Sequence, residues 1–306
     1  MTDCVINGVS IDESFAEAFP MRGTRIIVTA HNITWARHAG QTATGFATSV
    51  IACGAEAGIE RELSPDETPD GRPGVALLLF AMSSKELAKQ LERRVGQCVL
   101  TCPTTAVYAG LEAPETLPLG KNLRFFGDGW QISKVIDGVR YWRVPVMDGE
   151  FVAQETTGMV KAVGGGNLLL LARDTDSALA GAEAAVAAMK AIPGVVMPFP
   201  GGVVRSGSKV GSKYKALSAS TNDAYCPTLV GLTPKSDLDE RTACVMEIVI
   251  DGLTFDAVAD AMRAGIAVLC ERGGAAGVHR IAAGNYGGKL GPFHFHLRQL
   301  LPKDHA

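Results

Sequence analysis

Two stretches of this 306-residue chain repeat one apolar helix pattern, and this repetition constrains the fold more than any other feature. In both, apolar residues follow at intervals of four, four and three positions: Leu87, Leu91, Val95 and Cys98 in one, Val258, Met262, Ile266 and Leu269 in the other. Such intervals place four side chains on one face of a helix, which packs against a core. The shared spacing predicts that one structural unit occurs twice.

The elements around each stretch follow in the order strand, helix, strand, strand, helix, strand. In the first half, strands are expected at 25–30, 48–53, 75–82 and 123–126, with one helix at 32–43 and another begun by Ser83 and Glu86 as a capping box. In the second half, strands are expected at 167–172, 195–205 (broken by a turn at 199–202), 244–250 and 279–283, with helices at 176–190 and after the cap Thr254. A last strand, 293–297, is expected at a sheet edge.

This order is that of a split β-α-β unit, in which two helices cover one face of an antiparallel sheet. We therefore predict an α+β fold made of two duplicated ferredoxin-like lobes. The expected boundary divides the chain into residues 1–147 and 148–306.

Composition excludes several classes of protein. A mean hydropathy of +0.15 with 20% charged residues excludes a disordered chain. The net charge of −3 disfavours a partner held by its phosphates, so no nucleic acid is expected. The longest apolar run, 75–82, is far shorter than the roughly 20 residues that span a bilayer. With no basic start before an apolar core at Met1–Cys4, we expect a cytoplasmic protein without a membrane partner.

No metal site is expected either. The seven cysteines form no Cys-x-x-Cys pair, and His294 and His296 alternate along one strand without a third ligand nearby. Reduced cysteines and strand-face histidines are the simpler interpretation.

Glu247 is the most informative residue, because it is a lone carboxyl within the apolar strand 244–250. Burial raises the pKa of a carboxyl toward neutrality, where it can accept and return a proton. The alternative is an edge strand with Glu247 facing water.

Two loops carry further candidates. Arg205, Lys209 and Lys213 lie four residues apart in a Gly- and Ser-rich stretch, which suits a carboxylate or phosphate unless it is only a solvated basic surface. In the stretch 220–227, Asn222 offers a hydrogen-bond donor to a developing oxyanion, and Asp223 offers a carboxylate that orients Asn222 or a ligand amine. The alternative is that these residues form an Asx-turn that holds its own backbone.

Glycines gather after strands at 54–58, 127–129, 164–166, 201–211 and 284–291, which indicates a cleft floored by backbone amides rather than ordinary turns alone. Substrate contacts are expected near them. The additional candidates for these contacts are Ser206, Tyr225, Asp128 and Asn285.

Seven segments resemble formylmethanofuran–tetrahydromethanopterin formyltransferases. They are GFATSVIACGAEAGIE (45–60), ETPDGRPGV (67–75), GQCVLTCPT (96–104), RFFGDGWQ (124–131), PFPGGVVRSGSKVGSK (198–213), STNDAYCPT (220–228) and AGNYGGKLG (283–291). The resemblance covers nearly the whole chain. It implies two ferredoxin-like lobes, no metal or tightly bound cofactor, and a homo-oligomer, typically a tetramer. It also implies that Glu247 matches the proposed catalytic carboxyl of the family.

The implied reaction moves a formyl group between the amine of methanofuran and a ring nitrogen of tetrahydromethanopterin, which act as coenzyme substrates. The amine is itself the nucleophile, which agrees with the absence of an activated Ser or Cys motif. We expect Glu247 to move the proton, Asn222 and glycine amides to bind the oxyanion, and Arg205, Lys209 and Lys213 to bind anionic tails. The resemblance further implies membership of a larger formyltransferase–hydrolase complex.

Two other functions remain open from the sequence. A formyl-tetrahydromethanopterin hydrolase would use water in place of the acceptor amine. A non-enzymatic RNA-binding module shares the predicted topology, but it needs paired exposed aromatics and a basic face, whereas this chain is net acidic with 6% aromatics.

Overall fold

A computed structural model describes residues 4–301, and contacts within the chain divide it into two compact units. Unit 2 consists of Met21–Ala162 and Gly252–Thr254, and unit 1 contains the remaining described residues. The boundary expected after residue 147 would divide the chain once along its sequence. Each compact unit instead combines stretches that are far apart in the sequence, so the expected boundary stays a prediction. The expectation of a cytoplasmic protein rests on Met1–Cys4, and residues 1–3 lie outside the described part of the chain.

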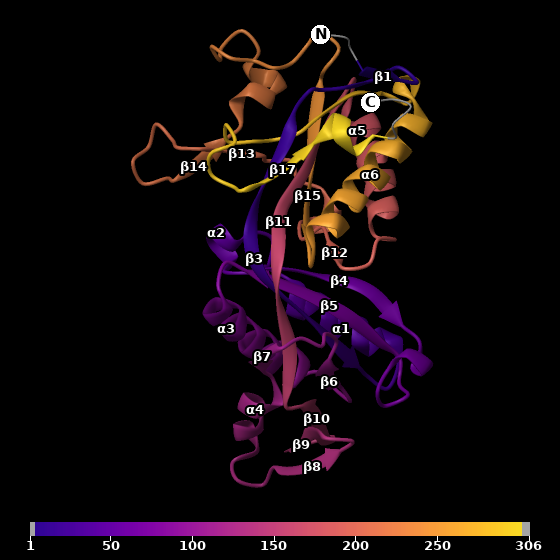
Figure 1. Ribbon diagram of the computed structural model, residues 1–306, viewed down its shortest axis with the longest axis vertical. Coiled ribbons are helices and arrows are strands. Elements are labelled where there is room, and N and C mark those ends of the chain that lie inside the picture. Colours follow the sequence, from indigo (N-terminus) through magenta and orange to yellow (C-terminus); the bar gives the residue numbers. More distant parts are fainter. Residues whose placement is uncertain (1–3, 302–306) are drawn as a thin grey trace. The chain divides into compact units, whose positions relative to one another are not determined.

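Unit 2 is a mixed sheet covered by short helices (Figure 1). Its strands are β4 (Glu56–Leu63), β5 (Gly74–Ala81), β6 (Ala106–Ala109), β7 (Glu115–Pro118), β8 (Ile132–Ile136), β9 (Val139–Val146) and β10 (Gly149–Gln154), with parts of β3 (Phe15–Thr29) and β11 (Thr156–Ala172). Its helices are α1 (Ile33–Thr44), α2 (Val50–Cys53), α3 (Ser84–Arg94) and α4 (Gly120–Leu123). The strand order is β4-β5-β3-β6-β10-β9-β8, antiparallel except for the parallel pair β6 and β10.

The strands of unit 1 also pair in mixed directions, and they lie beside two long helices. Its elements are β1 (Cys4–Ile6), β2 (Val9–Ile11), α5 (Thr175–Met189), β12 (Val195–Val196), β13 (Ser208–Val210), β14 (Ala219–Thr221), β15 (Cys244–Gly252), α6 (Phe255–Arg272), β16 (Val278–Ala282) and β17 (Phe293–His296), with the remaining parts of β3 and β11. The order is β1-β2-β16-β11-β15-β12, and β2 runs parallel to β16. As expected, the last strand β17 pairs at an edge, along the first residues of β3.

The expectation of antiparallel sheets is therefore only partly right. Parallel neighbours need a long connection, and β2 and β16 are joined by almost the whole chain. Sequence periodicity does not show such a pairing between distant segments.

The core of unit 1 forms where α5 and α6 lie side by side on the sheet (Figure 1). The four stripe residues of α6 are all buried: Val258, Met262, Ile266 and Leu269. The two helices approach closely, because a Cβ at Gly265 would collide with the side chain of Met189. This packing confirms the helix pattern read from the second half.

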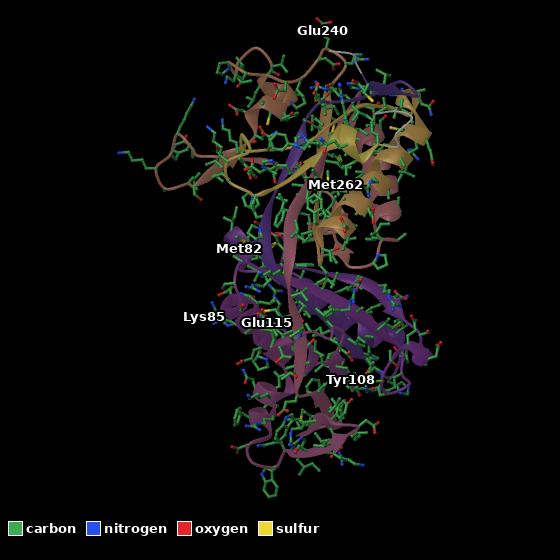
Figure 2. The ribbon with its side chains drawn as sticks, viewed as in Figure 1. Met82, Lys85, Tyr108, Glu115, Glu240 and Met262 are labelled. Carbon is green, nitrogen blue, oxygen red and sulfur yellow. The ribbon has the colours of Figure 1, made fainter. Side chains whose placement is uncertain are left out.

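The two helices expected in the first half are also present. Asn32 caps α1 through a bond from Trp35 N, and Ser83 caps α3 through a bond from Glu86 N. Only half of the capping box forms, because the Glu86 carboxylate binds other side chains of the helix. Met82 and Lys85, on either side of the cap, point outward (Figure 2).

Three expected strands are wrong or shortened. Residues 50–53 form α2, which Ser49 caps and Gly54 ends with φ +74°, and the strand lies later, at β4. Residues 123–126 lie in α4 and a 3₁₀ turn, and the strand is β6. In 195–205 only β12 and a bridge at Val204 pair with β15. Short apolar runs do not distinguish a strand from a helical turn.

Candidate active site

Glu247 lies in β15, on the face opposite the core residues Ile248 and Ile250. Its backbone is fixed by a bridge to Val204, with Glu247 N donating to Val204 O at 2.9 Å and Val204 N donating to Glu247 O at 2.7 Å. The bridge brings the Gly-rich segment 201–211 alongside the strand at this residue. The most informative carboxyl of the sequence therefore faces the expected glycine-rich stretch.

The Glu247 carboxyl is desolvated and has no hydrogen-bond or ion-pair partner in the described part of the chain. Burial raises its pKa from 4.5 to about 7. The edge strand of the alternative interpretation is wrong, because β15 pairs with β11 on one side and with β12 and Val204 on the other. The Glu247 side chain itself is partly buried. A carboxyl with such a pKa exchanges protons near neutral pH.

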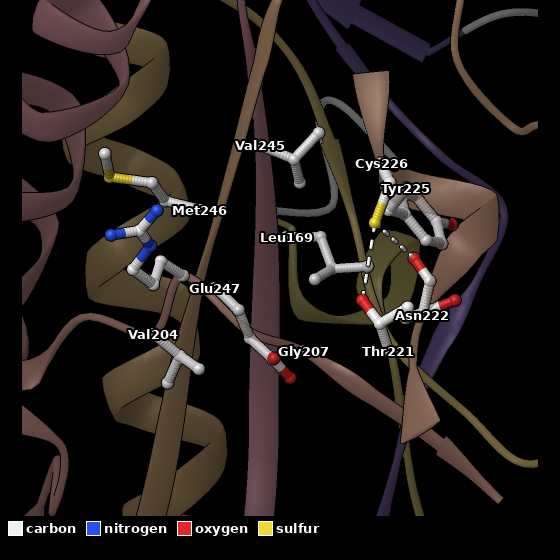
Figure 3. Close-up of a pocket in the computed structure, with 11 residues that line it drawn as sticks. Leu169, Val204, Gly207, Thr221, Asn222, Tyr225, Cys226, Val245, Met246 and Glu247 are labelled. Carbon is white, nitrogen blue, oxygen red and sulfur yellow. Dashed lines mark hydrogen bonds between the residues drawn. The ribbon is translucent and has the colours of Figure 1, made fainter. Parts of the chain in front are cut away.

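A pocket opens in front of this carboxyl (Figure 3). One wall is built from Glu247 with Val204, Arg205 and Gly207, and Leu169 of β11 lies in the lining. The Glu247 side chain extends toward Gly207 in Figure 3. A Cβ built at Gly207 would lie 2.9 Å from Glu247 Oε2, so the absence of a side chain there makes room for the carboxyl.

The loop after β14 forms another wall of the pocket, through Thr221, Asn222, Tyr225 and Cys226. Asn222 N donates to Gly207 O at 2.9 Å, which ties the loop to the segment beside Glu247. Cys226 Sγ donates to Asn222 O at 3.4 Å and lies 3.5 Å from Thr221 Oγ1 (Figure 3). The backbone of Asn222 is thus held in place at the lining of the pocket, and its side-chain amide has no hydrogen-bond partner among the described residues.

Lys209 and Asp223 form an ion pair across the β13–β14 hairpin. Thr233 Oγ1 also donates to the Asp223 carboxylate, at 3.3 Å. The hydrogen bond from Lys209 lowers the pKa of Asp223, which stays ionised. Neither side chain lines the pocket, and their ion pair links β13 to the loop that carries Asn222.

Comparison with known proteins shows the family of the chain. A formylmethanofuran–tetrahydromethanopterin formyltransferase from Methylococcus capsulatus is 69% identical over 297 residues, covering 97% of this chain and 99% of the relative. The chain belongs to this formyltransferase family. The family model of formylmethanofuran-tetrahydromethanopterin formyltransferase matches residues 4–146, and the model of the proximal lobe of that family matches residues 149–300.

Solved structures of formyltransferases have the same fold as this chain. The formyltransferase of Methanosarcina barkeri superposes with a TM-score of 0.91 at 46% identity, covering 97% of this chain and 99% of that one. A chain from the formyltransferase/hydrolase complex of Methylorubrum extorquens, solved with methylofuran, superposes with a TM-score of 0.96 at 55% identity, covering 99% and 100%. These similarities establish the mixed α+β architecture of the family in this chain.

Of the other residues expected to contact the substrates in this formyltransferase family member, some line the pocket and others lie outside it. Arg205 and Tyr225 line the pocket, and burial raises the pKa of Tyr225 to about 12. Ser206 and Lys213 are exposed outside the lining. Asn285 is exposed and accepts a bond from Gly287 N at 3.1 Å within its own loop.

Asp128 belongs to unit 2, where it ends a 3₁₀ turn with φ +48°. It is therefore not part of the pocket beside Glu247. Its expected substrate contact stays a prediction.

Sequence reasoning missed Glu17, which is buried in β3 at 1% exposure and binds the loop 284–291. The residue was open to the argument used for Glu247, because it is a lone carboxyl between apolar neighbours in Phe15–Phe19. It also missed Tyr286 in that loop, where only Asn285 was expected to matter.

Two findings concern other kinds of site. Across residues 4–301, no three His, Cys, Asp or Glu side chains are grouped as a metal ion would need. His294 and His296 instead pack on Phe15, with ring centroids 4.8 and 5.1 Å away. Every helix of the described chain is too short or too polar to span a membrane.

Proposed function

We propose that this chain transfers a formyl group between methanofuran and tetrahydromethanopterin, with Glu247 moving the proton. The observation that carries the proposal is a desolvated carboxyl, with a pKa of about 7, in the pocket of a chain that belongs to the formyltransferase family. The two coenzymes are the substrates. The enzyme is a formyltransferase of one-carbon metabolism.

The reaction proceeds by direct attack of one substrate nitrogen on the formyl carbon carried by the other. One C–N bond forms and the other breaks, so that the attacking nitrogen loses a proton and the leaving nitrogen gains one. Glu247 accepts the first proton as a carboxylate and returns it as an acid, which a pKa near neutrality allows in both directions. Both coenzymes are held together in a ternary complex, and neither water nor an acyl-enzyme takes part.

The developing oxyanion needs a donor that is fixed before the reaction. Asn222 fits this role, because its backbone is anchored to Gly207 and the residue lines the same pocket as Glu247. Asp223 supports it through the ion pair with Lys209.

Cationic side chains near the pocket suit the anionic parts of the coenzymes. Arg205 lines the pocket, and Lys209 and Lys213 follow it along the hairpin segment. The remaining substrate contacts are assigned to Ser206, Tyr225, Asn285 and Asp128. Binding of an anionic tail by Lys209 requires sharing this lysine with Asp223.

We assign the fold to two ferredoxin-like lobes. The supporting observation is the strand order, which is β6-β3-β5-β4 in one set and β16-β11-β15-β12 in the other. Numbered along the chain, both sets have the order four, one, three, two, and both carry their helices after the first and third strands.

The assembly is assigned as a cytoplasmic homotetramer that is also able to join a larger complex. A relative from Methylorubrum extorquens, 55% identical over the full length of both chains, is named as one subunit of a formyltransferase/hydrolase complex. Size-exclusion chromatography with light scattering gives the mass of the purified protein, and a monomer would contradict the tetramer.

The test of the proposed reaction is Glu247→Gln, which keeps the shape of the side chain and removes its proton transfer. We expect turnover to fall by about 10²–10⁴ with little change in coenzyme binding. Glu240→Gln, on an exposed loop (Figure 2), is the control and stays at the wild-type rate. Full activity of the Glu247 variant contradicts the mechanism, and formyl loss at the same rate without methanofuran contradicts the transfer.

A further inference from the structure

The carboxylate of Glu17 organises the loop 284–291. Its Oε2 accepts bonds from Tyr286 N at 2.7 Å and Gly288 N at 2.8 Å, and its Oε1 accepts from Leu290 N at 2.6 Å and Gly291 N at 2.7 Å. The loop therefore wraps around a buried anion that belongs to the protein itself.

Glu17 stays ionised despite this burial. Desolvation raises its pKa, but the four backbone donors together lower it to about 2. A second buried side chain, Asn167, holds the start of the loop: it accepts from Gly284 N at 2.6 Å and donates to Gly284 O at 3.0 Å. The loop conformation is thus fixed by specific bonds and not only by its glycines.

The loop carries Tyr286 to the region of Glu247. The Tyr286 hydroxyl binds the side chain of Ser208, which follows Gly207 in the chain, and its ring centroid lies 6.0 Å from that of Phe19. Burial and the nearby Glu247 charge raise the pKa of the Tyr286 phenol. Ser208 follows Gly207, whose Cβ position is 2.9 Å from Glu247 Oε2, so the bond to Ser208 holds Tyr286 on the segment next to the carboxyl and within reach of its charge.

Other groups near Glu247 do not account for its desolvated state. The charged or titratable side chains that line the pocket, or that pair with or lie next to the segments lining it, include Arg205, Lys209, Asp223, Tyr225, Cys226, Tyr286 and Glu17. None of them donates a hydrogen bond to the Glu247 carboxyl within the described residues, and burial is what shifts its pKa. The proton affinity of Glu247 therefore depends on what keeps water away from it.

Building on the proposed role of Glu247, we propose that Glu17 is a positioning residue for formyl transfer. It fixes the loop 284–291 so that Tyr286 covers the Glu247 side of the site and excludes water from that carboxyl. Glu17 touches no substrate and acts through Tyr286.

The test variant is Glu17→Gln. A glutamine offers one oxygen to two of the four N–H groups and presents an NH₂ group to the other two, so half of the loop anchors are lost. We expect the acid limb of the kcat/KM profile, which follows Glu247, to move to lower pH by about one unit as water reaches the carboxyl. Hydrogen exchange of the amides of 286–291 accelerates in the same variant.

The matched control is Glu56→Gln in unit 2. Glu56 is also buried and accepts a backbone bond, from Val50 N at 2.9 Å, but it is not part of the pocket. We expect this variant to lose stability without a change in the pH profile. A shift in both variants would show a general effect of a damaged fold and would overturn the proposal.

A double variant tests whether Glu17 acts through Tyr286. Tyr286→Ala alone is expected to move the acid limb in the same direction, and adding Glu17→Gln to it moves the limb no further. An additional shift of full size in the double variant, or a wild-type profile in either single variant, overturns the proposal. Should Glu17→Gln fail to fold, the Tyr286→Ala profile decides alone.

The outcomes also separate this proposal from the proposed function. If Glu247→Gln retains activity, the assigned reaction mechanism fails. If Glu247→Gln is inactive while Glu17→Gln keeps the wild-type profile, only the role of Glu17 fails.

Discussion

Gly207 lies against the carboxylate of Glu247 so closely that a Cβ at this glycine would be 2.9 Å from Oε2. The same residue accepts the backbone bond from Asn222 N at 2.9 Å. One glycine therefore links the proposed proton-transfer group to the proposed oxyanion donor. The lack of a side chain makes room for the Glu247 carboxylate, whereas the bond from Asn222 uses only the backbone carbonyl of Gly207.

Gly207→Ala is accordingly expected to damage catalysis more than stability. The new methyl group displaces the Glu247 carboxylate, and a displaced catalytic group costs about 10- to 100-fold in rate. Steady-state kinetics should show the loss mainly in kcat. Gly96→Ala, whose Cβ would meet only an ordinary contact at 3.4 Å from Leu123, is the control and should remain active. A wild-type kcat for Gly207→Ala would contradict the placement of the carboxylate.

Asn222→Ala tests the oxyanion donor. The variant keeps the backbone bond to Gly207 and loses only the side-chain amide, the proposed oxyanion donor, so we expect kcat to fall about 10²- to 10³-fold. Asn122→Ala removes a comparable side-chain donor in unit 2, where Asn122 binds Glu92 at 2.6 Å, and should leave kcat unchanged. An equal loss in the two variants would assign the effect to stability.

The spacing of apolar residues predicted the long helices, because one face of each helix is buried and its apolar residues recur at every turn. The α6 stripe that ends at Leu269 repeats over several turns and packs on a core, so its spacing is visible in one sequence. The strand expected at 48–53 was wrong because Val50 and Ile51 are equally compatible with one helical turn, and the Ser49 cap decides the outcome. The strands β8, β9 and β10 were missed. Of these, β8 is exposed along its whole length and has no buried face that a sequence pattern could show.

The sequence predicted a site residue only where a charged side chain occurs among apolar neighbours. Glu247 was identifiable because a carboxyl within an apolar strand needs an explanation, and the structure places it at the pocket. The ion pair of Lys209 and Asp223 was not, because residues fourteen apart meet only once the β13–β14 hairpin forms. Glu17 was missed although it follows the same rule as Glu247, since β3 was expected to begin ten residues later than it does.

The raised pKa of Glu247 also makes stability depend on pH in a defined direction. The folded state binds a proton with a pKa of about 7, whereas the unfolded state releases it near 4.5, so the folded protein holds more protons between these values. The free energy of unfolding therefore decreases as pH rises from about 4.5 to 7, by at most about 3 kcal/mol from this group. Glu247→Gln stays neutral throughout and lacks this decrease. Urea unfolding at pH 5 and pH 8 should thus show the variant gaining stability relative to wild type at the higher pH, and an identical difference at the two pH values would mean that Glu247 is solvated in the folded protein.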